Sequence, residues 1–272
     1  MTIVHNDQMT TEARLERLAS YKLADWAADA DQLDGDILVR SKRALADDID
    51  DPDAAIAAGG IVSFLQGMSR KNKDDVLNSF MFARLAASYQ YDSKAEGDQW
   101  YKLFIQVMSD FGWVGFKDRY TRYTASERRF TMDQVGLKIL ATAIAAASLP
   151  GPAAAALLTV AKGAVAALQQ NTEALRLFER QSRKHRDADF AIASGMQLQD
   201  GDLLMAMGSV HITATTEVTN VLFTEWQSSS VSIVRAEDVV VLNRSAFTDE
   251  VSRELVVLLG DHTKTSLKKY KI

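Results

Sequence analysis

Four histidines are the side chains of this sequence best suited to acid–base chemistry or to binding a transition metal. They are His5, His185, His211 and His262, and they show neither the HExxH pattern nor any paired spacing of a zinc site. His185 lies among arginines and a lysine in RQSRKHRD, and these cations disfavour its protonation. We therefore expect a solvated histidine at a helix end, and we predict neither a catalytic residue nor a bound metal.

Acidic clusters and short motifs add no catalytic prediction. The run DDIDDPD at residues 47–53 lacks the central glycine and the terminal glutamate of a calcium-binding loop. The sequence contains no GxxxxGK, GxGxxG or GxSxG motif and no cysteine, so it offers no common phosphate-binding loop, nucleophile elbow or thiolate site. We predict no cofactor, and we favour a non-catalytic protein over an enzyme whose site is not legible in the sequence.

The charge balance restricts the possible partners. With 31 basic and 36 acidic side chains the formal net charge is -5, whereas a nucleic-acid-binding protein needs a basic surplus. We predict no nucleic-acid partner. The stretch MTIVHNDQMTTEARLERL lacks the basic start and apolar run of a secretory signal peptide. We expect a soluble chain that is cytoplasmic until it is released or exported by a non-classical route.

The spacing of apolar residues divides the chain into a helical part and a strand-rich part. From residue 9 to about residue 186, apolar residues recur three and four positions apart, and Thr131 with Gln134 forms a capping box. After residue 186 the pattern becomes that of strands, and Asp200 with Gly201 is a turn signal between the first two. The predicted strands are ADFAIASGMQLQ, DLLMAMGSVHITAT, EVTNVLFTEW and VSIVRAEDVVVLN.

These patterns predict an α+β fold. It comprises a mostly helical N-terminal bundle with a central hydrophobic helical hairpin, then a C-terminal antiparallel β-meander and a terminal helix. The expected domains are residues 1–187, with the hairpin at 132–186, and residues 188–272, which end in a basic tail. The boundary is soft, because an Asp-Gly turn before an apolar run predicts an extra strand at residues 37–40, and the two parts could form one intertwined domain.

The predicted hairpin is GLKILATAIAAASLPGPAAAALLTVAKGAVAALQQ, residues 136–170, within which residues 139–161 carry no charge. Pro150 and Pro152 flank Gly151, so one helix should end at about Leu149 and a second should run from Pro152 to about Arg186. Small residues four positions apart should let the two arms pack closely. They are Ala141 and Ala145 in the first arm, and Thr159, Gly163 and Ala167 in the second.

The apolar arms must meet either the core of the protein or lipid. Each uncharged arm covers about 15 Å, short of the ~30 Å hydrocarbon thickness of a bilayer. The pattern resembles the hydrophobic hairpin of helical pore-forming toxins and colicins, which keep such a hairpin hidden in the water-soluble form and release it at a membrane. The resemblance implies insertion by Ile139, Leu140, Ile144, Leu149, Pro150, Gly151, Pro152, Leu157, Leu158 and Val160.

Basic residues lie on both sides of the hairpin and favour an anionic lipid surface. The segment DFGWVGFKDRYTRY adds aromatic side chains that suit the headgroup region, although ordinary core packing explains its tryptophan and phenylalanines as well. The predicted membrane-docking residues are Trp113, Phe116, Lys117, Arg119, Arg122, Arg128, Arg129, Arg183, Lys184 and Arg186.

Together these features predict a soluble membrane-active protein of the bacterial helical toxin or virulence type, with a target membrane as its partner. A pore would require a homo-oligomer on the membrane, because two short arms enclose nothing. The alternative is a non-catalytic interaction module in which the hairpin is permanently buried core and a partner protein binds elsewhere.

Overall fold

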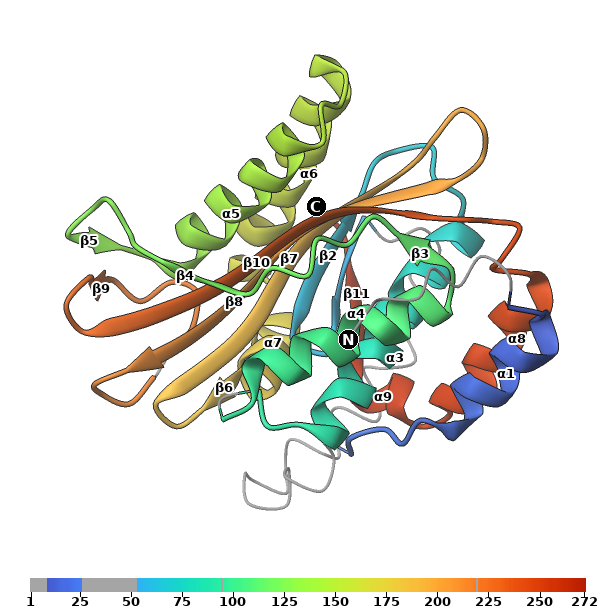
Figure 1. The fold of residues 1–272 in the computed structure, drawn as a ribbon. Coiled ribbons are helices and arrows are strands. Elements are labelled where there is room, and N and C mark those ends of the chain that lie inside the picture. Colours follow the sequence, from blue (N-terminus) through green and yellow to red (C-terminus); the bar gives the residue numbers. More distant parts are fainter. Residues whose placement is uncertain (1–8, 26–52, 94, 219) are drawn as a thin grey trace.

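The computed structural model describes residues 9–25, 53–93, 95–218 and 220–272. The predicted extra strand at residues 37–40 and most of the acidic run at residues 47–53 lie outside these ranges. Within them, helices pack on both faces of a large mixed sheet, so the chain is a mixed α and β protein, consistent with the predicted α+β class (Figure 1).

The sheet has the strand order β11-β1-β2-β7-β8-β10-β3, with β4 also paired to β10 and β6 to β7. All these pairs are antiparallel except β2 and β7, which are parallel. The strands are β1 Ala54–Ala57, β2 Gly60–Phe64, β3 Trp113–Val114, β4 Thr121–Tyr123, β6 Arg183–Lys184, β7 Asp187–Gln197, β8 Leu203–Ala214, β10 Val231–Leu242 and β11 Leu267–Tyr270.

Three of the four predicted meander strands are present as β7, β8 and β10. The turn between β7 and β8 is the predicted one, with Gly201 at φ 93° and the Leu198 amide donating to the Asp202 carbonyl at 2.8 Å. The prediction of a strand at EVTNVLFTEW was wrong. Its apolar residues Val221 and Leu222 are buried in a loop against the start of α5 (Met132–Ala146), where the Leu222 carbonyl accepts from the Met132 amide, and only β9 (Trp226–Gln227) pairs, with β5 (Arg129–Phe130).

The N-terminal part is not the helical bundle that was predicted, because β1 and β2 lie inside it. They form a hairpin through Ala58 and Gly59, whose φ angles of 48° and 75° suit a two-residue turn. β2 then pairs in parallel with β7, so one sheet crosses the predicted boundary at residue 187. A short apolar run such as AAIA gives no periodicity that separates strand from helix, which is why the sequence failed here.

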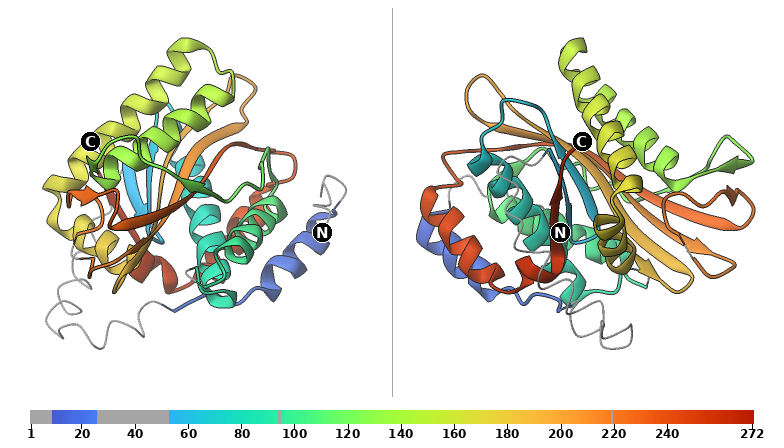
Figure 2. Two further views of the ribbon diagram at one scale, coloured as in Figure 1. Left: turned by 60° about the vertical axis from the view of Figure 1, so that its left-hand side comes forward. Right: turned by 180° about the vertical axis from the view of Figure 1, so that it is seen from behind.

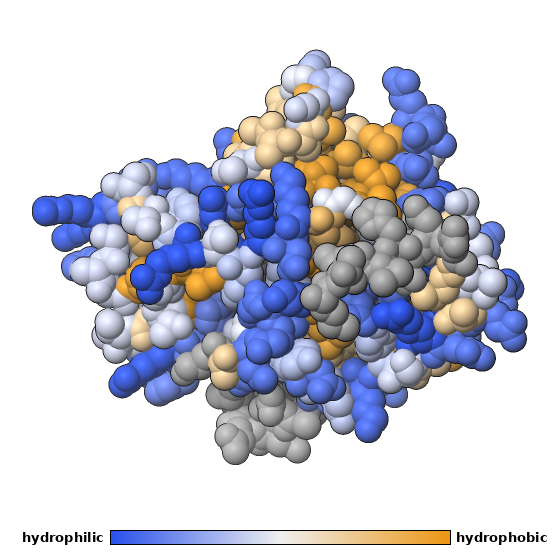
Figure 3. Space-filling model, in the orientation of Figure 1, coloured by the Kyte–Doolittle hydropathy of each residue, from blue (hydrophilic) through white to orange (hydrophobic). Residues whose placement is uncertain are grey.

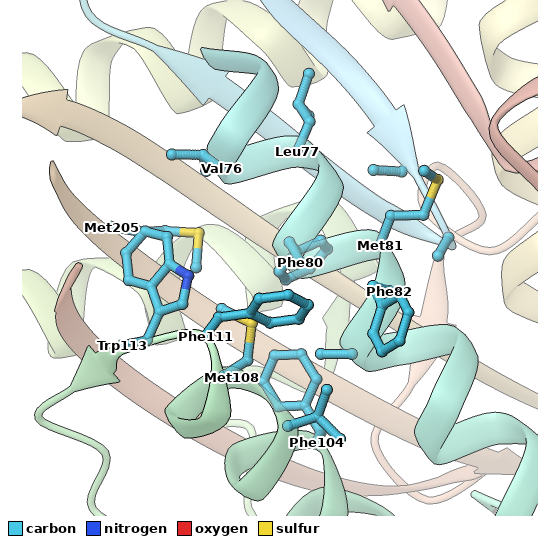
Figure 4. Close-up of a cluster of buried hydrophobic side chains, with 14 of the residues drawn as sticks. Val76, Leu77, Phe80, Met81, Phe82, Phe104, Met108, Phe111, Trp113 and Met205 are labelled. Carbon is cyan, nitrogen blue, oxygen red and sulfur yellow. The ribbon is translucent and has the colours of Figure 1, made fainter. Parts of the chain in front are cut away.

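One face of the sheet is covered by α3 (Arg70–Gln90) and α4 (Gly97–Asp110), with α1 (Thr11–Ser20) and α8 (Asp249–Leu259) packed beside them. Aromatic side chains dominate this core (Figure 4). Phe80 and Phe104 meet edge to face at 5.8 Å between ring centroids, and Phe82 and Phe111 at 5.3 Å. We call this the aromatic face of the sheet.

The opposite face carries α5, α6 (Gly151–Gln170) and α7 (Thr172–Ser182), while α9 (His262–Ser266) precedes the edge strand β11. α5 lies across β7, β8 and β10, and α6 lies across β2 and β7. We call this the hairpin face. The α5–α6 pair rises beyond the end of the sheet in each view (Figures 1 and 2).

The hairpin differs from its prediction at both ends of the turn. The capping box of α5 is confirmed, with the Thr131 amide donating to Gln134 Oε1 at 3.5 Å. α5 ends at Ala146, and Ser148, not Gly151, takes the positive φ. The predicted long second helix is interrupted at Asn171, whose side chain accepts from the Ala174 amide and so begins α7.

Candidate functional site

The lower half of the hairpin, which we call the hairpin base, is part of the core. A Cβ on Gly208 of β8 would lie 2.9 Å from Ile139 Cγ2 and 3.0 Å from the Leu140 amide nitrogen, so α5 crosses β8 where a side chain is absent. Gly136 of α5 approaches Ile192 of β7 in the same way. These contacts show that the hairpin base is fixed against the sheet at backbone distance.

The second arm is held by its own contacts at the base. Leu157, Ala161, Ala164 and Leu168 of α6 are all fully buried. The hydroxyl of Tyr270, on the edge strand β11, donates to the Ala164 carbonyl at 3.0 Å. The C-terminal strand therefore ties α6 to the sheet.

The upper half of the hairpin, residues 145–156, is open, and we call it the hairpin tip. Ala145, Ala155 and the Pro150–Pro152 turn are exposed, and a Cβ added to Gly151 would meet no atom within 4 Å. α6 is long and apolar enough to cross a membrane, yet only 28% of its apolar window is buried, whereas the core helix of a soluble protein is mostly buried. α6 is therefore an apolar helix that is mostly not buried, both at the tip and along the outer side of the base.

Apolar surface continues from the tip onto the sheet. Leu149 and Leu158 of the hairpin are partly exposed, and they belong to the same cluster as partly exposed residues at the strand ends. Figure 3 shows hydrophobic surface below the tip, between the hairpin and the neighbouring polar loop. The contributing strand-end residues on this face are Leu65, Met196, Leu198, Val239 and Val241.

The predicted insertion residues divide between the two halves. Four of them, Ile139, Leu140, Ile144 and Leu157, are buried at 4% exposure or less and hold the hairpin to the sheet. Leu158 and Val160, on α6 just below the tip, are partly exposed, as is Leu149 in the tip. Only the turn residues Pro150, Gly151 and Pro152 are freely exposed. The sequence could not reveal this division, because burial in the base depends on contacts with the distant sheet, such as that of Ile139 with Gly208.

Three of the five small residues predicted to bring the arms together do not lie between them. Ala145 and Thr159 are exposed, and Thr159 donates its hydroxyl to its own helix, to the Ala155 carbonyl. Gly163 faces Ile272 at the C-terminus, not α5. Buried residues of both arms belong to one cluster with the sheet beneath them.

Two aromatic residues predicted to dock on lipid belong to the aromatic face. Trp113 is fully buried and donates from Nε1 to Ser79 Oγ at 3.0 Å, so it is a core residue. Phe116 is partly buried, with its ring 6.3 Å from that of Phe104. The core alternative for this segment is confirmed for Trp113, because its indole is buried inside the protein and its N–H already has a hydrogen-bond partner.

The predicted basic docking residues are all exposed, but they do not lie at the tip. Arg122 is on β4, Arg128 and Arg129 flank the start of β5, and Lys184 is on β6. β5 is followed by Thr131, the cap of α5, so Arg128 and Arg129 lie at the opposite end of that helix from the tip, a distance of about 22 Å for 15 residues. The remaining members of the set are Lys117, Arg119, Arg183 and Arg186.

A buried polar cluster on the aromatic face was not predicted. The Arg84 guanidinium donates to the Ala58 carbonyl at 2.6 Å and to Asp189 Oδ1 at 2.9 Å, and it lies 5.1 Å from the Trp100 ring centroid. His211 Nδ1 is buried 4.0 Å from Asp189 and has no hydrogen-bond partner. Since Arg84 joins the β1–β2 turn to β7, we assign the cluster a structural role.

A second buried pair lies near this cluster. Tyr101 donates its hydroxyl to Asp238, which also accepts from the Lys117 amide at 2.8 Å. Burial raises the pKa of Asp238 above its ordinary value, and it raises the pKa of Tyr101 well above that of a free tyrosine. Asp238 therefore fixes the loop after β3 to the sheet.

Comparisons with known proteins identify no family for this chain. No family model matches it, and no curated protein matches it. A solved structure described as "Structure of the Evf virulence factor" is similar over 86% of this chain and 98% of its own, at 12% identity and a TM-score of 0.36. A TM-score this low does not establish a shared fold, so function has to be inferred from the site.

Among the residues that the structure describes, no group of three or more histidine, aspartate or glutamate side chains could hold a metal ion.

Proposed function

We propose that the protein acts at a target membrane by burying its hairpin tip in the lipid surface. The observation that carries the proposal is the open apolar α6, whose membrane-length window is only 28% buried in the folded protein. In this account the tip enters while the base remains on the sheet. The geometry thus supports a shallow version of the insertion that the sequence predicted.

Energetics favour shallow entry over release of the whole hairpin. Ile139, Leu140, Leu157 and Leu168 are fully buried, and burying each such side chain contributes about 1.5–3 kcal/mol. In lipid these side chains would regain an apolar environment, but the apolar sheet residues beneath the hairpin would become exposed to water. The cost is therefore on the order of 10 kcal/mol, comparable with the whole stability of a typical domain.

The positions of two lysines limit how deeply the tip can enter the bilayer. Lys138 on α5 is exposed and pairs with Glu127, and Lys162 on α6 is exposed as well. Both lie about 15 Å from the turn along their helices, so they would stay in the headgroup region when the turn enters the acyl chains. Apolar elements that lie in the interface enter by about 5–10 Å, which the tip can reach without moving its base.

A toxin or virulence role is the wider form of this proposal. It is supported by the likeness of the sequence pattern to the hairpin of helical pore-forming toxins. A pore would further require several copies of the chain to assemble on the membrane.

Vesicle binding tests the proposal with matched variants of α6. Ala155→Asp places a charge on the exposed tip, and Ala166→Asp places the same charge on an exposed site of the hairpin base. A carboxylate costs about 2.5–3.5 kcal/mol at the centre of a bilayer and less near its surface, so Ala155→Asp should weaken co-sedimentation with vesicles at least about tenfold. Ala166→Asp should leave it unchanged.

The same experiment also tests the alternative function, binding of a partner protein. If the wild type does not sediment with phosphatidylcholine or phosphatidylglycerol vesicles at neutral or mildly acid pH, the membrane proposal is wrong, and the open apolar face would serve a protein partner. Circular dichroism of both variants checks that each is folded. Release of an entrapped dye then separates surface docking from pore formation.

A further inference from the structure

The two edges of the sheet differ in how they are closed. At one edge, both lysines of β11 already have carboxylate partners, Glu173 at 3.0 Å and Asp74 at 2.8 Å. The other edge is formed by β3 and β4 beside β10, and among the described residues β4 pairs with β10 alone. The backbone groups on the outer side of β4 therefore have no strand partner, and an open edge of this kind can pair with a strand of another chain.

The side chains of β4 point alternately to the two faces of the sheet. Tyr123 lies opposite Ile233, which belongs to the buried cluster of the hairpin face. Arg122 lies opposite Val234, which is two residues before Ala236 of the buried cluster on the aromatic face. Since alternate residues of a strand share a face, Arg122 lies on the aromatic face and Tyr123 on the hairpin face. A strand added to β4 would present its own side chains in the same alternation.

On the hairpin face, a pocket of about 440 Å³ lies beside β4. Its apolar lining belongs entirely to the hairpin-face cluster and consists of Tyr123, Ala125, Phe130, Val231 and Ile233. Phe130 is on β5, so the β5–β9 pair, which lies next to β4 in Figure 1, supplies one wall. The volume is within the range of small-molecule sites, so the pocket has room for an apolar side chain from an added strand.

On the aromatic face, the corresponding position offers a positive charge. Arg122 is exposed, and within the part of the chain that the structure describes its guanidinium has no ion-pair or hydrogen-bond partner. The segment 117–129 contains five basic and two acidic residues, and one of these acids, Glu127, is already paired with Lys138. An acidic side chain opposite Arg122 would therefore be favoured, because opposite charges on neighbouring strands attract.

We propose that β4 is the docking edge for an extended segment of a partner protein in which acidic and apolar residues alternate. The backbone of this segment pairs with the open side of β4 and extends the sheet by one strand. One acidic side chain of the segment lies opposite Arg122, and the next side chain, which is apolar, enters the pocket beside Tyr123. The site is separate from the hairpin tip and does not depend on membrane docking.

Binding of synthetic peptides to the full chain, followed by fluorescence anisotropy, tests the site. The probe is TEVELEVET, whose glutamates lie on one face of a strand and whose valines and leucine lie on the other. The peptide TEEVLVEET has the same composition and charge without the alternation, and a form of the probe methylated on its five central backbone nitrogens cannot donate hydrogen bonds to β4. We expect saturable binding of the probe and at least about tenfold weaker binding of both controls, because each loses part of the strand pairing.

Two charge reversals in the protein locate the binding edge. Arg122→Glu should weaken binding of the probe about tenfold, because it replaces a cross-strand attraction with a repulsion. Arg176→Glu makes the same change at an exposed position on α7 and should bind as the wild type does. Circular dichroism checks that both variants are folded. Bound probe should also slow hydrogen exchange in β4 of the wild type, which a purely electrostatic contact would not do.

The proposal is overturned if the probe shows no saturable binding up to about 1 mM, or if either control peptide binds equally well. It is also overturned if Arg176→Glu weakens binding as much as Arg122→Glu, because the peptide would then respond only to net charge. Ala155→Asp at the hairpin tip should leave peptide binding unchanged. Failure of membrane docking by the tip and failure of the strand-pairing site are therefore separate results.

Discussion

The two faces of the sheet are covered in different ways. On the aromatic face, four helices bury a continuous cluster of phenylalanine, tryptophan and methionine side chains. On the hairpin face, α5 and α6 cover the sheet only along the hairpin base, and partly exposed residues such as Leu65, Met196 and Leu198 remain at the strand ends. Both faces therefore supply stability, but only the hairpin face leaves apolar surface available for binding.

The largest expected effect comes from opening the aromatic face. Phe104 is 1% exposed and packs against Phe80, Trp100 and Tyr101. Phe104→Ala should lower the free energy of unfolding by about 3–5 kcal/mol, measured by urea denaturation. Leu149→Ala at the partly exposed tip should lower it by less than about 1 kcal/mol. Equal losses would contradict the difference between a fully covered face and one left open at the hairpin tip.

A smaller effect should follow from adding one methyl group beneath the hairpin base. A Cβ at Gly208 would come within 3.0 Å of the Leu140 amide, which is backbone and cannot rotate away. Gly208→Ala should therefore cost about 1–3 kcal/mol of stability. Gly151→Ala at the tip, where the added Cβ meets nothing within 4 Å, is the matched control and should be neutral or slightly stabilising in thermal unfolding.

How much of this could be predicted from the sequence depended on whether a signal was local. The α5 cap, the Asp200–Gly201 turn and the three long strands were predicted, because caps, turns and alternation are read from neighbouring residues. The strands β1 and β2 were missed, since both depend on partners far away in the sequence. GIVSF pairs with β7, where Gly60 lies opposite Ala191, and AAIA pairs with β11, where Ala54 lies opposite Tyr270.

The candidate site was predicted only in outline for the same reason. The sequence located an apolar hairpin, but it could not show that Ile139 rests on Gly208 while Gly151 is open. Similarly, Trp113 next to basic residues looked like a docking residue, and only the fold places it on β3 beside β10, with Ser79 as its hydrogen-bond partner.

A pH-dependent effect sharpens the comparison further, because the aromatic face also buries a carboxyl group. Burial raises the folded-state pKa of Asp238, so between the ordinary aspartate pKa of about 4 and that raised value the folded protein binds more protons than the unfolded chain. This group therefore makes stability fall as pH rises through that window. Asp238→Asn removes the titration, so the melting temperature of the variant relative to wild type should rise with pH. Curves that remain parallel would show that Asp238 does not titrate in this way.

Hydrogen–deuterium exchange beside lipid vesicles tests the central claim most directly. With anionic vesicles, exchange should slow at the hairpin tip, residues 145–156, and remain unchanged at the hairpin base around Ile139 and Leu168. That result would show that the tip enters lipid while the base stays on the sheet. Unchanged exchange at the tip would contradict docking, and faster exchange in the sheet beneath the hairpin would contradict shallow entry.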